Sequence, residues 1–409
     1  MIQQLAFIIT LGVAIYFIRK RVMLISMTIK LGKKKDIKDN IPDRIRNMVL
    51  VAFGQKKMFK RFIPAFLHFF IYIGFLVINL EVLEFVIDGL AGTHRMFAPF
   101  LGPFYTVMMN IFEFLAFSVL TACAIMLIRR NVLKVKRFWS AEMTSWPRMD
   151  ANLILITEIV LMLAILKMNA ADQVLQTRIE DHYPATGHLF ISSVLVPVFQ
   201  NFSTPFLIFV ERAAWWFHII GILGFAVYIT YSKHLHIFLA FPNTYFSKLE
   251  AKGHLNNMPV VTNEVKSMLG LADVNAAPPA EPGRFGAKDI NDLSWNNLLA
   301  AYSCTECGRC TSECPANLTG KKLSPRKIMM DTRDRLEEVG KSIQQNGKGL
   351  EDGKSLLGDY ITKEEINACT SCNACVEACP VMINPLEIIV ELRRYVAMEE
   401  SGSPPSWNS

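Results

Sequence analysis

The feature of the sequence that most constrains the fold is a series of long apolar runs within the first 240 of its 409 residues. A helix needs about 20 mostly apolar residues to cross the hydrocarbon core of a membrane. Five runs meet this requirement, the first of them marginally. They cover residues 2–18, 62–83, 104–128, 153–166 with its flanks, and 206–231. We therefore predict an all-α chain that begins with a bundle of five transmembrane helices.

The basic residues predict how these helices cross the membrane. Fourteen Lys and Arg residues lie between Arg19 and Arg61, and six more lie between Arg129 and Arg148, in both cases between apolar runs. A formal net charge of +7 also suits a nucleic-acid partner, but this placement is the positive-inside pattern of cytoplasmic loops. We expect a multi-pass protein of the cytoplasmic (inner) membrane, with its N-terminus outside, the chain beyond about residue 233 in the cytoplasm and no nucleic-acid partner.

Three further features of the first 240 residues can be interpreted from the sequence. The first run lacks a basic leader and ends in Arg19-Lys20-Arg21, which favours an anchor over a cleaved signal peptide. Residues 187–199 of an outer connection are apolar enough to form a short helix along the membrane surface. Cys123 stands alone in an apolar run and is interpreted as a small packed side chain.

Three histidines lie in or beside the apolar runs. His68 follows the basic stretch 56–61 by about two helical turns, His218 lies in the fifth run, and His236 lies just past its cytoplasmic end. His218 and His236 are five helical turns apart, so they share one face and stand about 27 Å apart along the axis. An imidazole in hydrocarbon is costly and usually functional, and a haem held by two histidines needs them to face inward from different helices. We therefore predict haem b as a cofactor.

The depth of each histidine indicates how they pair. His68 and His236 both lie towards the cytoplasmic side and are natural partners for one haem. His218 lies further out and needs another ligand, for which His94 is the preferred candidate among the outer-loop histidines. The sequence thus indicates one or two haems. The alternative is that each ring satisfies a neighbouring backbone carbonyl; three histidines at matched depth and face favour haem.

Eight of the nine cysteines form two arrays of identical spacing, each C-x₂-C-x₂-C-x₃-C followed by Pro. The first array is Cys304, Cys307, Cys310 and Cys314, and the second is Cys369, Cys372, Cys375 and Cys379. This spacing holds [4Fe–4S] clusters, and the fourth cysteine of each array ligates the other cluster. Three thiolates wrap a cube from one loop, and Pro directs the fourth Cys onto a helix aimed at the other cube. The predicted ligand sets are Cys304, Cys307 and Cys310 with Cys379, and Cys369, Cys372 and Cys375 with Cys314.

Other uses of these cysteines fit the pattern less well. Structural zinc sites usually use two separated pairs rather than triplets. A redox-sensing role is disfavoured because ligation accounts for every thiol in the arrays. A secreted disulfide scaffold would not place cysteines two and three residues apart after a multi-span membrane segment.

The rest of the second half is expected to be mainly helical. Ser324 is a candidate cap for a helix with Pro in its first turn, and residues 385–399 form an amphipathic helix that packs against the clusters. Residues 341–359 are expected to form a loop, 273–285 a linker rich in Ala and Pro, and 401–409 a disordered tail. The predicted domains are a transmembrane domain over residues 1–240, a cytoplasmic linker over 241–294, a ferredoxin-type domain with two [4Fe–4S] clusters over 295–398, and a tail over 399–409.

The membrane half resembles the nitrate reductase gamma-subunit family, five-helix cytochromes b that exchange electrons with quinone. The resemblance rests on Trp215-Trp216-Phe217-His218 and Ser232-Lys233-His234-Leu235-His236, and it spans roughly residues 50–240. In that family two histidines of the last helix pair with two of the second, which implies haem ligation by His68, His218 and His236. The sequence departs at the fourth position, where Ile78 and Asn79 stand, so the ligand set of the outer haem stays open.

The cysteine-rich half resembles the small iron–sulfur subunit of heterodisulfide reductases and a related subunit of anaerobic glycerol-3-phosphate dehydrogenase. The resemblance covers about residues 295–398 and rests on the arrays, on Ser324-Pro325-Arg326-Lys327, and on Asn384-Pro385-Leu386-Glu387-Ile388-Ile389. Members with substrate chemistry add domains with paired CCG motifs, whereas this chain has no adjacent cysteines. The resemblance therefore implies a separate cytoplasmic CCG-domain partner.

These patterns predict a membrane-bound electron-transfer subunit of a quinone-linked respiratory oxidoreductase. Electrons would pass between quinone, haem b and the two clusters, to or from the cytoplasmic partner. The sequence contains no nucleophile–base constellation, P-loop or dinucleotide fingerprint, so we expect little catalysis beyond quinone oxidation or reduction. Two alternatives stay open: a haem-free membrane anchor for a soluble iron–sulfur oxidoreductase, and a subunit of a redox-driven ion pump.

Overall fold

The computed structural model describes residues 1–179, 182–271, 284–347 and 352–402. The chain divides into two compact units: Met1–Val22 with Met58–His234, and Met23–Lys57 with Leu235–Ser409. All regular secondary structure in the described ranges is helical, and extended segments there pair only as isolated bridges. The prediction of an all-α chain is thus confirmed.

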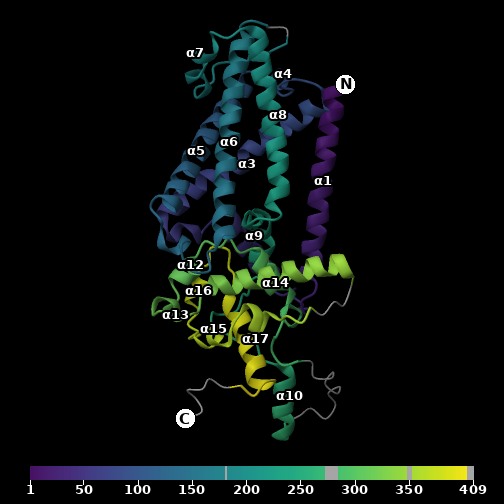
Figure 1. Cartoon of the computed structure of the whole chain (residues 1–409), viewed down its shortest axis with the longest axis vertical. Coiled ribbons are helices and arrows are strands. Elements are labelled where there is room, and N and C mark those ends of the chain that lie inside the picture. Colours follow the sequence, from purple (N-terminus) through teal and green to yellow (C-terminus); the bar gives the residue numbers. More distant parts are fainter. Residues whose placement is uncertain (180–181, 272–283, 348–351, 403–409) are drawn as a thin grey trace. The chain divides into compact units, whose positions relative to one another are not determined.

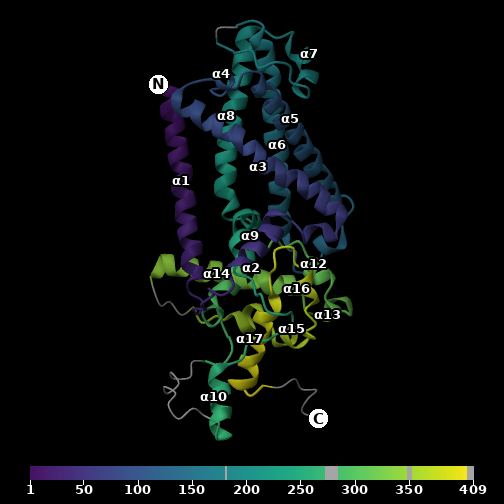
Figure 2. The same ribbon diagram turned by 180° about the vertical axis from the view of Figure 1, so that it is seen from behind.

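Four long helices of the first unit pack in sequence order, α3 on α5, α5 on α6 and α6 on α8 (Figures 1 and 2). They are α3 Phe62–Ala91, α5 Pro103–Asn131, α6 Ser145–Gln176 and α8 Thr204–Ile229. Each is long and apolar enough to cross a membrane, which confirms four of the five predicted spans. The first predicted span lies in α1 Ile2–Ile29, which continues from the first unit into the second. Because α1 is not among these four helices, the fifth crossing stays a prediction.

Shorter elements connect these helices. They are α4 Ala98–Leu101, α7 Val196–Phe199 and the 3₁₀ turns Met58–Lys60, Lys136–Phe138 and Ser192–Val194. The predicted surface helix over residues 187–199 is wrong in its first part, where Gly187 has φ 78° and the carbonyl of His188 accepts a hydrogen bond from Asn110. Backbone groups committed to such contacts are not free to form a helix.

The side chains of the four-helix bundle are arranged inside out relative to a water-soluble bundle. Large apolar side chains face outward; Phe62, Phe104 and Phe209 are each more than 60% exposed. Carboxyl side chains are buried instead, and these are Glu81, Glu84, Asp88, Glu113, Asp150, Asp172 and Glu211. This distribution suits a bundle in lipid, where polar groups must find their partners inside the protein.

The second unit is built from shorter helices. Its α-helices are α2 Ile41–Asn47, α9 His236–Tyr245, α10 Pro259–Met268, α11 Trp295–Tyr302, α12 Arg309–Ser312, α13 Pro315–Leu318, α14 Pro325–Asn346, α15 Lys363–Asn367, α16 Ala374–Ala378 and α17 Pro385–Met398. Single turns lie at Met48–Phe53, Ile290–Asp292 and Leu356–Tyr360, and Lys233–Leu235 joins the units. α14 packs against α11, α12 and α17, and α17 also packs against α15 and α16. Ile328, Leu336 and Leu392 are fully buried in this unit.

The predicted elements of the second unit agree with the structure except at one loop. Ser324 caps α14 by accepting a hydrogen bond from the Lys327 amide, and α17 covers the predicted helix over residues 385–399 up to Met398. The predicted loop over 341–359 is wrong at its start, because α14 continues to Asn346 and ends at Gly347 with φ 85°. Most of the predicted linker 273–285 and tail 401–409 lies outside the described residues.

Candidate functional site

The two cysteine arrays share one local backbone fold. In each array, the residue before the second cysteine and the residue after it adopt the left-handed conformation. The φ values are 53° at Glu306 and 71° at Gly308 in the first array, and 56° at Ser371 and 61° at Asn373 in the second. Gly and Asn adopt this conformation at the lowest cost. The repeated bend follows from the repeated spacing and curves both loops in the same way.

The third cysteine of each array lies on a short helix that begins at the left-handed residue. Gly308 caps α12, which carries Cys310, and Asn373 caps α16, which carries Cys375. The fourth cysteines differ. Cys314 caps α13, as predicted for a cysteine followed by Pro, but Cys379 ends α16 and leads into a turn.

Thiols of the two arrays lie close enough to influence one another's pKa. Besides burial, the pKa of Cys310 is raised by the thiols of Cys307, Cys304, Cys379 and Cys375. The pKa of Cys379 is likewise raised by burial and by the thiol of Cys307. Besides burial, the pKa of Cys314 is raised by the thiols of Cys369 and Cys372. The pKa of Cys375 is raised by burial and by the thiols of Cys369, Cys314 and Cys372. The fourth cysteine of each array thus lies near thiols of the other array.

The donor groups of this region are the eight free thiols of the two arrays. No three His, Cys, Asp or Glu side chains within the described ranges converge around a point as the ligands of one metal ion do. A [4Fe–4S] cube is larger than an ion and takes one thiolate on each of four irons. Eight thiols in two groups are the chemistry that two such cubes require.

Burial and backbone amides act in opposite directions on these thiols. Burial raises the pKa of Cys304 and of Cys375 to about 12, and that of Cys379 to about 11. Backbone amides partly offset this effect: the Ile383 amide donates to Cys379 Sγ at 3.3 Å, and the Ser371 amide donates to Cys369 Sγ at 3.4 Å. Cationic iron and N–H donors both stabilise a thiolate. These sites therefore suit thiolates bound to a metal cofactor.

The first array lies in a cationic and buried environment. Arg309 and Arg326 are 4% and 1% exposed. Arg326 donates to the carbonyl of Glu306 at 3.4 Å, and Arg333 pairs with the carboxylate of Glu306 at 2.5 Å. Positive charge beside an iron–sulfur cluster stabilises its reduced, more negative form.

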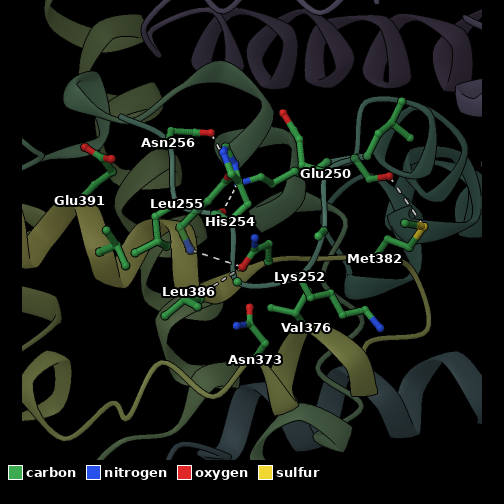
Figure 3. Close-up of a pocket in the computed structure, with 18 of the residues that line it drawn as sticks. Glu250, Lys252, His254, Leu255, Asn256, Asn373, Val376, Met382, Leu386 and Glu391 are labelled. Carbon is green, nitrogen blue, oxygen red and sulfur yellow. Dashed lines mark hydrogen bonds and ion pairs between the residues drawn. The ribbon is translucent and has the colours of Figure 1, made fainter. Parts of the chain in front are cut away.

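The second array lies closer to the surface. Cys372 is the exposed one of the eight cysteines, and its neighbours Thr370 and Ser371 are also exposed. A cavity of about 290 Å³ borders this array (Figure 3). Its walls include Asn373 and Val376, which face the segment 247–256. This end of the unit is therefore open to contact from outside.

His218 lies in the first unit with one ring nitrogen fixed and the other without a partner. The residue is 1% exposed, and its Nδ1 lies 3.1 Å from the carbonyl oxygen of Leu161 on α6. A carbonyl only accepts, so Nδ1 carries the proton and Nε2 carries the lone pair. Nε2 is buried and has no hydrogen-bond partner among the described residues. A histidine held in this way presents Nε2 for a metal.

Gly221 keeps α8 close to the carbonyl that orients His218. A Cβ atom on Gly221 would lie 2.6 Å from Cδ2 of Leu161, closer than side chains approach one another. Gly221 follows His218 by three residues, so it lies on the same face of α8. The small residue thus permits the contact between α8 and α6 that holds Nδ1.

The other predicted haem ligands have different environments. Both ring nitrogens of His94 are committed, Nε2 to Asp172 at 3.0 Å and Nδ1 to Arg212 at 2.9 Å. Iron ligation by His94 would require one of these contacts to break. His68 lies half-buried on α3 of the first unit, and His236 begins α9 in the second. Because they belong to different units, their pairing stays a prediction.

A buried polar network around Arg95 is the feature that the sequence analysis missed. Arg95 is 5% exposed and donates to Asp172 at 2.8 Å, to Asn169 at 2.9 Å and to the Tyr105 hydroxyl at 3.2 Å. Tyr105 in turn donates to Glu84 at 2.8 Å.

The sequence does contain a pattern from which this network could have been predicted. Glu81, Glu84 and Asp88 recur at intervals of three and four residues, as do Asn169, Asp172 and Gln176. This periodicity places each set on one helix face.

Comparisons with known proteins agree with the geometry of the arrays. Residues 303–383 match the family model of the 4Fe-4S dicluster domain. The second unit thus carries the chemistry of iron–sulfur electron transfer.

Over nearly its whole length the chain is similar to larger iron–sulfur oxidoreductases. It is 29% identical to the probable iron-sulfur-binding oxidoreductase FadF of Bacillus subtilis, over 97% of this chain and 56% of that protein. It is 27% identical to the EtfAB:quinone oxidoreductase of Syntrophomonas wolfei, over 90% of this chain and 50% of that protein. The chain spans about half the length of these curated relatives.

A shorter similarity confirms the predicted relation to heterodisulfide reductases. The chain is 30% identical to one subunit of the dihydromethanophenazine:CoB–CoM heterodisulfide reductase of Methanosarcina acetivorans, over 28% of each chain. No solved structure matches the chain. The comparisons therefore support iron–sulfur electron transfer, while the resemblance to a haem-bearing nitrate reductase subunit stays a prediction.

Proposed function

We propose that this protein is a membrane-bound electron-transfer subunit that connects quinone in the membrane to a cytoplasmic iron–sulfur oxidoreductase. The observation that carries the proposal is that the fourth cysteine of each array lies near thiols of the other, in a chain that also has four membrane-length helices. Crossed ligation holds two clusters close together, as electron transfer between them requires.

The clusters would be held by the eight cysteines in two crossed sets. One set is Cys304, Cys307, Cys310 and Cys379, and the other is Cys369, Cys372, Cys375 and Cys314. The clusters supply one-electron redox chemistry, while this chain supplies the thiolates, the amide donors and the cations around them. The exposed position of Cys372 favours the second cluster as the contact point for a soluble partner.

His218 would hold a b-type haem through Nε2. The support is its unpartnered buried nitrogen and the Leu161 carbonyl that fixes its tautomer. The haem supplies a one-electron step between a two-electron quinol and the clusters. His68 and His236 are the proposed ligands of an inner haem, and the committed nitrogens of His94 disfavour it as a partner of His218.

The direction of membrane insertion and the partner follow from the same proposal. The basic loops support a cytoplasmic position for the second unit. The similarity to a heterodisulfide reductase subunit supports the proposal that the cytoplasmic partner is a separate CCG-domain protein. The name of the Syntrophomonas relative supports quinone as the membrane-side reactant.

Anaerobic reduction by a quinol tests this function. The full-length protein in detergent is mixed with a short-chain quinol, while optical absorbance follows haem and freeze-quenched EPR follows the clusters. We expect haem reduction first and cluster reduction after it. The H218A variant should retain its clusters and lose their reduction by quinol, while dithionite still reduces them. Wild-type clusters without haem absorbance would instead favour the haem-free anchor.

A further inference from the structure

Glu81 is a buried carboxyl group with an oxygen that has no partner within the described part of the chain. It lies on α3 and is 3% exposed, and its Oε1 is buried without a hydrogen bond within the described part of the chain. Its neighbours one turn away on the same helix face, Ile78 and Phe85, both belong to the apolar core of the bundle. Buried polar groups are normally hydrogen-bonded, so an unpartnered oxygen needs an explanation.

The same apolar core connects Glu81 to His218. The ring of Phe85 lies 5.7 Å from the ring of His218 and 6.3 Å from that of Trp215, the residue one turn before it on α8. Glu81 is one turn of α3, about 5.4 Å along the axis, from Phe85. Two buried polar atoms without partners, Glu81 Oε1 and His218 Nε2, thus border one core cluster from facing helices.

The negative charge of an ionised Glu81 is poorly balanced by its surroundings. The charged side chains that interact with it are one cation, Arg95, and two carboxylates, Glu84 and Glu113. The contacts of Arg95 go to Asp172, Asn169 and Tyr105, so its charge is shared with other groups. Whether Glu81 is ionised therefore depends on any further charge that enters this region, since charges interact strongly in a low dielectric.

We propose that Glu81 takes up a proton when the haem held by His218 is reduced, and releases it when that haem is oxidised. The inference rests on the proposed haem at His218. One electron enters the haem and one proton from the aqueous phase binds the Glu81 carboxylate, so the net charge of the bundle core is unchanged. The polar network from Glu84 through Tyr105 and Arg95 to Asp172 and His94 is the proposed route by which the proton reaches Glu81.

The midpoint potential of the haem as a function of pH tests this inference. The full-length protein is titrated with redox mediators between about pH 5 and pH 9, and haem absorbance is followed. The component that depends on His218 is identified by its loss in H218A. One proton per electron makes its potential fall by up to about 59 mV per pH unit. The E81Q variant should show no slope, and its potential should equal the acid limit of the wild type, because a neutral side chain mimics the protonated form.

Control variants separate this role from a structural one. E158Q removes another carboxyl of the bundle, on α6, and should keep the wild-type slope. E81D keeps a titratable group and should keep a slope even if E81Q fails to assemble. A flat wild-type profile, or an E81Q slope equal to that of the wild type, overturns the inference and leaves the proposed function intact. Absence of any His218-dependent haem overturns both.

Discussion

Arg335 is the side chain whose removal should most damage the second unit outside the cysteine arrays. It lies on α14 and is 3% exposed. It donates to Asp289 at 2.8 Å, to Asp352 at 2.5 Å and to the Lys354 carbonyl at 2.8 Å. Asp289 also accepts from the Leu356 amide at 3.1 Å. Arg335 therefore ties the chain before the first array and the chain before the second array to one helix.

The cost of the R335A substitution follows from burial. Removing one partner of a buried charge pair costs about 3–5 kcal/mol. The side chains of Asp289 and Asp352 are each 20% exposed, so water partly solvates them after the change. We therefore expect the lower end, about 3 kcal/mol, which lowers the midpoint of thermal unfolding by about 6–12 °C for a unit of this size.

Thermal unfolding of the full-length protein in detergent measures this effect, followed by the loss of iron–sulfur absorbance. R335K keeps the charge but not the planar fork that binds two carboxylates, and should fall between R335A and the wild type. The matched control is K322A, because Lys322 pairs with Glu364 at 2.6 Å but is 68% exposed. Its effect should stay within about 1 kcal/mol. An R335A midpoint within the range of K322A would refute the reasoning.

The same contact predicts a dependence on pH. The hydrogen bond from Arg335 lowers the pKa of Asp352 below its ordinary value of 3.8. A carboxyl whose pKa is lowered by folding stabilises the folded state above its unfolded pKa, and this contribution is lost as the pH falls below it. The difference in stability between wild type and R335A should therefore shrink as the pH falls below about 4. A constant difference across that range would contradict the assignment.

Three further predictions concern the cofactor sites. The C372S variant should lose EPR signal from the second cluster, whereas C123S should keep both clusters, because Cys123 is packed in the bundle core. The G308V variant should assemble with less iron than the wild type, because a β-branched residue at φ 71° costs about 1–2 kcal/mol of strain. The H218A variant should lose a b-type haem, while H94A should keep its haem content; equal haem content in both variants would refute the assignment of His218.

The features predicted correctly from the sequence are those that depend on residues close together in the chain. Runs of apolar residues predicted four membrane-length helices. The spacing of the cysteines predicted an iron–sulfur domain over residues 295–398, where the 4Fe-4S dicluster model matches residues 303–383. Helix ends were less predictable. The apolar run over residues 153–166 lies within α6 Ser145–Gln176, because polar residues at both ends continue the helix. α14 continues to Asn346 for the same reason.

The contacts missed from the sequence are those that join distant segments. Arg95 lies in a connection after α3, and its partner Asp172 lies on α6, 77 residues later. The interpretation of His94 as a ligand candidate relied on depth alone, but the contacts of both nitrogens depend on α6 and α8. The orientation of His218 depends on a carbonyl of α6 and could not be read from its own helix.

The measurement that tests the central claim most directly is a count of cofactors in the purified full-length chain. Non-haem iron and acid-labile sulfide are measured chemically, haem by absorbance and clusters by EPR after dithionite reduction. The account predicts roughly eight non-haem irons per chain in two magnetically interacting [4Fe–4S] clusters, together with b-type haem that diminishes in H218A. A protein that binds zinc at the cysteine arrays, or that carries both clusters and no haem, would contradict it.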